Sequence, residues 1–71
     1  MSVAKIIEIT STSSVSFDDA VKQGIKRASQ TIDDIKSAWI ENQQVTVENG
    51  AITGYRVAMK ITFVLHGSAA D

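Results

Sequence analysis

The dipeptide Asn49-Gly50 lies between two long runs rich in β-branched and aromatic residues, and it constrains the fold more than any other feature of the chain. Asn-Gly between extended segments is a strong signal for a type I′ hairpin turn, because both residues tolerate positive φ. The flanking runs predict antiparallel strands over about 35–48 and 51–65. The C-terminal part of the chain is therefore expected to form one long β-hairpin.

The N-terminal part predicts a strand followed by a helix. Residues 3–10 are short, β-branched and roughly alternating, which favours a strand, and the hydroxyl-rich "STSS" after them is expected to be a turn. Ser16 is a candidate N-cap whose hydroxyl would accept a hydrogen bond from the backbone N–H of Asp19. The helix is predicted over about 17–30, and the acidic pair at 33–34 is expected to mark the next turn.

The predicted helix has one apolar side and one basic side. The apolar positions recur at helical spacing and comprise Phe17, Ala20, Val21, Gly24, Ile25, Ala28 and Ile32. Lys22, Lys26 and Arg27 fall on the other side. Gly24 would let a strand or helix approach closely, and the odd-numbered apolar residues from Tyr55 to Leu65 are expected to pack on this helix.

These elements predict an α+β fold with the order β-α-β-β. The last strand is expected in the middle of a three-stranded antiparallel sheet, order 1-3-2, with the long hairpin wrapping the helix. The two-residue loop sets a register in which Val47 is opposite Ile52, Gln43 opposite Arg56, and Trp39 opposite Lys60. Residues 1–71 are read as a single domain that ends in a short tail, "GSAAD".

Composition limits the classes of function. The net charge is −1, with seven basic and eight acidic residues interspersed, so no basic patch for nucleic acid is expected. The apolar runs are too short for a membrane span or signal peptide, which makes a soluble cytoplasmic protein the default expectation. Cysteine is absent, and His66 has no evident catalytic partner, so no nucleophile–base pair is predicted and the chain is not expected to be an enzyme.

The lengths of the predicted elements imply self-association. A strand of about 14 residues spans roughly 46 Å, whereas a helix of about 15 residues spans only about 22 Å. One helix cannot cover such a hairpin, and exposed sheet of that size marks an interface. Without disulfides, a chain of 71 residues is expected to gain stability as a closed homo-oligomer.

Trp39, the only tryptophan, lies among polar residues on its strand. Strict alternation places it on one face with Ser37, Glu41 and Gln43, opposite Arg56, Ala58, Lys60 and Thr62. One interpretation is a polar subunit interface, where tryptophan is enriched. The other is a ligand platform, on which the indole stacks on a planar heterocycle and a cation or amide binds its polar edge or phosphate.

The chain resembles the dodecins. The similarity is carried by the β-α-β-β order, "TSTSSVSFDDAV", "RASQTIDDI" and "GAITGYRVAMKITFVL", and it covers roughly residues 3–65. The resemblance implies a hollow homododecameric shell that binds flavins between subunits and stores or sequesters them without catalysis. In flavin-binding dodecins a tryptophan near the start of the second strand stacks on the flavin, and that position corresponds to Ser37, two residues before Trp39. The family glutamine that binds the flavin edge corresponds to Arg56.

Three hypotheses follow for this chain. In the first, a flavin (FMN, riboflavin or FAD) stacks on Trp39, Arg56 binds its polar edge or phosphate, and Ser37, Gln43 and Lys60 line the site. In the second, the shell binds calcium or magnesium through oxygen ligands shared between subunits, drawn from Asp18, Asp19, Asp33, Asp34 and Glu41. In the third, the oligomer is purely structural and Trp39 is buried between subunits.

Overall fold

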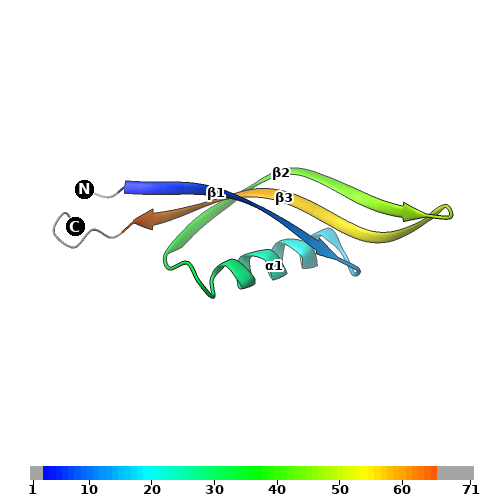
Figure 1. The fold of residues 1–71 in the computed structure, drawn as a ribbon, viewed down its shortest axis with the longest axis horizontal. Helices are drawn as coiled ribbons and strands as arrows, with labels where there is room; N and C mark the ends of the chain where they lie inside the picture. The colour runs from blue at the N-terminus through cyan, green and yellow to red at the C-terminus, as the bar shows by residue number, and fades with distance from the viewer. Residues whose placement is uncertain (1–2, 66–71) are drawn as a thin grey trace.

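A computed structural model describes residues 3–65. The chain forms β1 (Val3–Ser13), α1 (Phe17–Ala28), β2 (Ile35–Glu48) and β3 (Ala51–Leu65), as Figure 1 shows. The three strands form one antiparallel sheet in the order β1-β3-β2. The predicted α+β class, element order and strand order are confirmed.

The turn between β2 and β3 has the predicted conformation. Asn49 has φ of 52° and Gly50 has φ of 77°, so both central residues are left-handed, as a type I′ turn requires. Both hairpin strands have the predicted bounds.

The segment between β1 and α1 differs from the prediction. β1 continues to Ser13, three residues beyond the predicted end, so most of "STSS" is strand rather than turn. Pairing explains the extension, because Ser11 lies opposite Val57 and Ser13 opposite Tyr55 on the long central strand. Tertiary pairing here outweighs the local preference of hydroxyl residues for turns.

The helix begins as predicted and ends earlier. The Ser16 hydroxyl accepts a 3.0 Å hydrogen bond from the Asp19 backbone N–H, which confirms the N-cap. α1 ends at Ala28 rather than near residue 30, and the C-cap residue Ser29 donates its N–H to Ile25. Within residues 3–65, no helix has the length and apolar character needed to cross a membrane.

The core lies between α1 and the two strands β1 and β3. Ala20, Val57 and Met59 are fully buried, and the rings of Phe17 and Tyr55 pack edge to face with centroids 5.2 Å apart. A Cβ atom added to Gly24 would lie 3.0 Å from the Ser11 Cβ and 2.5 Å from the Met59 methyl carbon. The close approach predicted at Gly24 is therefore present, between the helix and β1.

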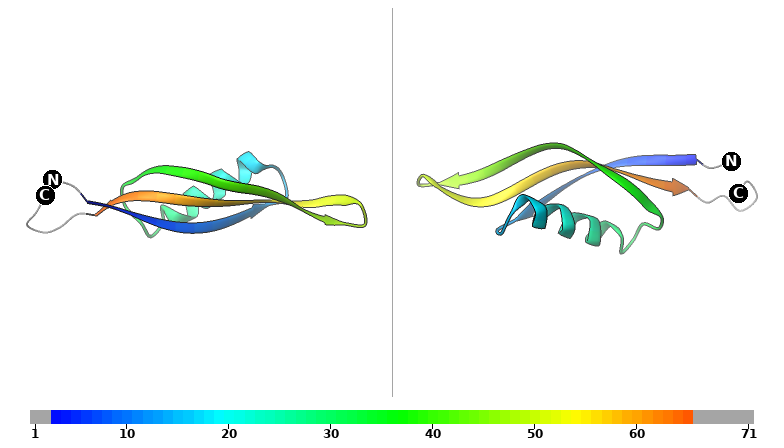
Figure 2. Two further views of the ribbon diagram at one scale, coloured as in Figure 1. Left: turned by 90° about the horizontal axis from the view of Figure 1, so that it is seen from above. Right: turned by 180° about the vertical axis from the view of Figure 1, so that it is seen from behind.

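The hairpin is much longer than its support. The molecule measures 56 × 19 × 13 Å, and the hairpin turn projects well beyond α1 and the end of β1 (Figures 1 and 2). β2 has no buried residue along its length. One helix leaves much of the sheet uncovered, which agrees with the length mismatch predicted from the sequence.

Candidate functional site

The candidate site lies on the outer face of the sheet, defined here as the face opposite to α1. Side chains alternate between the two faces of each strand, and directly paired residues share a face. Since Val57, Met59 and Ile61 are buried on the helix side, the residues between them point outward. The outer face is formed by Ile6, Glu8, Thr10 and Thr12 of β1, Arg56, Ala58, Lys60 and Thr62 of β3, and Ser37, Trp39, Asn42 and Gln44 of β2.

Trp39 is the largest exposed group on this face. Its residue surface is 74% exposed, and it lies opposite Lys60, as predicted. Ser37 lies on the same face, opposite Thr62. Trp39 lies two residues after Ser37, the position that corresponds to the family tryptophan. Because strand side chains alternate with a period of two, both residues lie on the outer face.

The ammonium group of Lys60 is bracketed by two carboxylates. Its Nζ lies 3.8 Å from a carboxylate oxygen of Glu8 and 3.9 Å from one of Glu41. These pairs are partly exposed, so they contribute little to stability, but they surround the cation with two negative charges. The surface beside Trp39 is consequently not a positive site.

Gln43 is not part of this face, and its predicted pairing with Arg56 is wrong. Gln43 lies opposite Val57, which is buried under the helix side of the sheet, whereas Gln44 lies opposite Arg56. The outer-face amide near Arg56 is therefore that of Gln44, a residue that the sequence analysis missed.

Two register shifts cause this exchange. Thr53 is an unpaired residue of β3, because Val47 pairs with Ile52 and Thr46 with Gly54. The Thr53 hydroxyl is 2.8 Å from the Thr46 hydroxyl and donates to the Thr46 carbonyl at 3.2 Å. Glu41 is unpaired on β2 and restores the original register, so Trp39 still meets Lys60.

A signal for the shift at Glu41 exists in the sequence. The apolar positions of the second strand are even-numbered at Ala38 and Ile40 but odd-numbered at Val45 and Val47. Such a change of parity within one strand indicates an inserted residue, because otherwise one of the two apolar sets would move to the opposite face.

Arg56 supplies an available positive charge on the outer face. It is exposed, lies between Thr12 and Gln44 in the sheet, and has no ion pair among residues 3–65. It lies four positions before Lys60 on β3, which corresponds to about 13 Å along the strand. The outer face thus presents an aromatic plate and a separate guanidinium group, joined by small and polar side chains.

The carboxylates considered for a metal ion are dispersed. Asp19 accepts a 2.5 Å hydrogen bond from Ser13, and Asp34 and Glu41 form ion pairs with Lys36 and Lys60. Within the described part of the chain, no group of three or more potential ligand residues surrounds a common point. His66 lies outside the described residues.

Comparison with known proteins identifies the family. The Dodecin family model matches residues 3–66. The calcium dodecin of Mycobacterium tuberculosis is 33% identical over 63 residues, covering 89% of each chain. A structure of calcium dodecin from that organism, described as calcium chelating and as having a novel calcium-binding site, is 31% identical with a TM-score of 0.80, covering 97% of this chain and 99% of that one.

A second structure gives the same result with a closer overlap of the backbone. Dodecin from Streptomyces davaonensis has a TM-score of 0.89 at 29% identity, covering 93% of this chain and 97% of its own. Family model, sequence and backbone geometry agree over nearly the whole length. The chain belongs to the dodecin family.

Proposed function

We propose that this chain forms a non-enzymatic homododecameric shell that binds a flavin between subunits and stores or sequesters it. The observation that carries the proposal is the 74% exposed indole of Trp39 on the outer face of the sheet. Exposing a large aromatic ring costs free energy in water, and stacking on a planar heterocycle would recover it. The family membership supports a small-molecule ligand.

Exposed apolar residues support the oligomer. Ile6, Val45, Val47 and Ile52 are 59%, 39%, 60% and 55% exposed, and they occur on both faces of a sheet that one helix covers only in part. Burial of one such side chain contributes about 1.5–3 kcal/mol. Assembly of several copies would cover these residues.

The residues of the outer face have distinct roles in this proposal. Trp39 stacks on the isoalloxazine, and Ser37 and Gln44 line the site. Arg56 binds the phosphate or polar edge, because it is the exposed cation without an ion pair, whereas Lys60 lies between two carboxylates. Lys60 therefore holds the carboxylates of Glu8 and Glu41 beside the Trp39 indole. The anionic end of the ligand points toward Arg56.

A flavin titration tests the proposal. FMN or riboflavin fluorescence is followed as purified protein is added, together with Trp39 emission. We expect saturable mutual quenching, and Trp39→Ala should weaken flavin binding by about 5- to 150-fold, since aromatic stacking contributes about 1–3 kcal/mol.

Arg56→Ala separates phosphate binding from stacking. It should weaken FMN binding more than riboflavin binding, because only FMN carries the phosphate. Lys36→Ala, an exposed cation paired with Asp34, serves as the control and should leave both affinities unchanged. If wild-type protein leaves flavin fluorescence unchanged while it is fully assembled, the flavin assignment is wrong.

Calcium is the second candidate, favoured by the 33% identity to calcium dodecin. A site within one chain has no support among residues 3–65, so the ligands would be shared between subunits. Asp18 and Asp33 are the members of the predicted set without an ion pair or hydrogen bond from their side chains in the described part of the chain. Calorimetry with CaCl₂ should then show binding heat that Asp18→Asn or Asp33→Asn reduces, and its absence in the assembled wild type excludes this candidate.

A further inference from the structure

The far end of the hairpin is an apolar projection without support from its own chain. β1 ends at Ser13, opposite Tyr55, so the strands beyond that point have neither a third strand nor the helix beside them (Figure 1). We define the hairpin tip as Val47, Glu48 and Ile52. Val47 and Ile52 are paired and are 60% and 55% exposed. Two strands alone are marginally stable in water, so this extension needs a partner.

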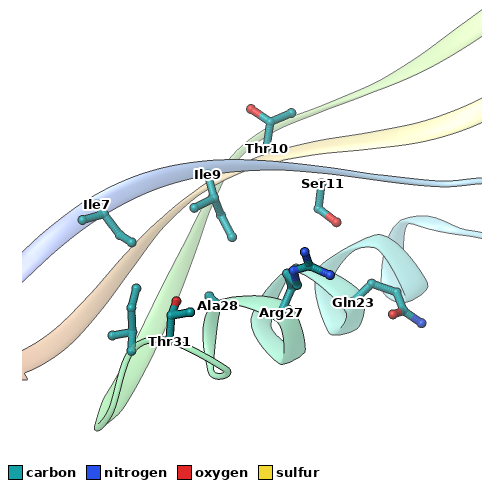
Figure 3. A pocket seen from close by; sticks show the side chains of 10 residues that line it. Ile7, Ile9, Thr10, Ser11, Gln23, Arg27, Ala28 and Thr31 are labelled. Atoms are coloured by element: carbon teal, nitrogen blue, oxygen red, sulfur yellow. The ribbon is translucent and has the colours of Figure 1, made fainter.

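A groove of about 630 Å³ lies between β1 and the C-terminal half of α1. Its apolar lining includes Ile7 and Ile9 from the strand and Ala28 and Ile32 from the helix side. Figure 3 shows Ile7 and Ile9 pointing from β1 toward the helix and the Arg27 side chain extending from α1 toward β1. Arg27 is exposed and lines this groove, whereas the sequence analysis placed it with Lys22 and Lys26 on the helix side opposite the apolar positions.

The groove and the hairpin tip are complementary in chemistry. Each combines apolar side chains with one charged residue, Arg27 in the groove and Glu48 at the tip. Neither Arg27 nor Glu48 has an ion pair within residues 3–65. The tip points away from α1 in both views of Figure 2, so it cannot reach the groove of its own chain.

We propose that the hairpin tip of one subunit docks in the β1–α1 groove of a second copy, with Glu48 of the tip paired to Arg27 of the groove. In this proposal the tip and the groove of one subunit engage two different neighbours, which makes the contact heterologous, and such a contact forms a closed ring when the rotation between successive subunits closes. The inference rests on the proposed self-association and adds the contact that drives it. It does not involve the outer face around Trp39.

A charge exchange tests the contact, with assembly measured by light scattering across a dilution series. Arg27→Glu and Glu48→Arg should each raise the dissociation constant at least about tenfold, since they place like charges together in a desolvated contact. The double variant Arg27→Glu/Glu48→Arg should restore assembly. Lys26→Glu makes the same charge change one residue away, outside the groove, and should leave assembly unchanged.

Disulfide trapping provides a second measurement, because the natural chain contains no cysteine. The variant Val47→Cys/Thr31→Cys carries one thiol at the tip and one at the groove, so oxidation should link successive subunits into covalent multimers larger than dimers. Val47→Cys alone should give no species beyond a dimer.

The outcomes separate this inference from the proposed function. If the wild type assembles, the single charge variants assemble equally well and the paired cysteines give no multimers, the docking contact is wrong while the shell remains. If the wild type is a monomer at all concentrations, both the contact and the shell are wrong.

Discussion

At the scale of single residues, Ser13 connects the end of β1 to the start of α1. It is 7% exposed, and its hydroxyl donates to the Asp19 carboxylate at 2.5 Å while accepting from the Val15 N–H at 2.9 Å. Asp19 in turn gives its backbone N–H to the Ser16 N-cap. One buried hydroxyl therefore holds both the chain reversal and the first turn of the helix.

Ser13→Ala should lower the free energy of unfolding by about 2 kcal/mol, because it removes a hydrogen bond to a charged group and leaves a backbone donor unsatisfied. Chemical denaturation measures the effect. Ser14→Ala, at the exposed neighbouring position, is the matched control and should change stability little. Equal losses for both variants would contradict the assigned role of Ser13.

At the scale of elements, the packing of α1 on β1 depends on Gly24. Its missing side chain allows the helix to approach Ser11 and the fully buried Met59 closely. Glycine inside a helix costs about 1 kcal/mol relative to alanine, so the contact must offset a loss of helix propensity.

Gly24→Ala should nevertheless destabilise the protein by about 1 kcal/mol, because overpacking costs about 1–3 kcal/mol and exceeds the gain in propensity. Met59→Leu shortens the side chain whose methyl group would lie 2.5 Å from the new Cβ, so it should recover part of the loss in the double variant. Denaturation midpoints of the two single variants and the double variant provide the measurement. If Gly24→Ala alone stabilises the protein, the prediction is wrong, and the side chains of Met59 and Ser11 can move to accommodate the added methyl group.

At the scale of the whole molecule, the one helix of a single chain covers only part of the sheet. β2 is exposed or partly exposed along its full length, and apolar residues are exposed on both faces and at the hairpin tip. A thin, 56 Å long protomer of this kind buries little apolar area by itself.

Stability should therefore depend on protein concentration. If the chain assembles as proposed, tenfold dilution should lower the free energy of unfolding per subunit by on the order of 1 kcal/mol, since assembly and folding are then linked by mass action. Thermal melts at several concentrations, with Trp39 emission as the probe, provide the measurement. A melting temperature that is independent of concentration in a reversible transition would contradict this linkage.

Local patterns in the sequence were sufficient for the elements and their order. Asn49-Gly50 specified the hairpin turn, Ser16 the start of the helix, and helical spacing the buried stripe, because each depends on conformational preferences within a few residues. The placement of Trp39 opposite Lys60 also matches the register expected from the turn, because the two register shifts between them cancel.

Long-range pairing decided the rest. Thr53 shifts the register by one residue and Glu41 shifts it back, so Gln44 rather than Gln43 shares a face with Arg56. β1 extends through its serines because the central strand offers partners there, and the groove beside Arg27 exists only once the helix lies against β1. The sequence alone thus determined which strands and helix form, through local propensities and turn chemistry. The tertiary structure decided which side chains meet, because a single unpaired residue in a strand reverses the faces of all residues beyond it.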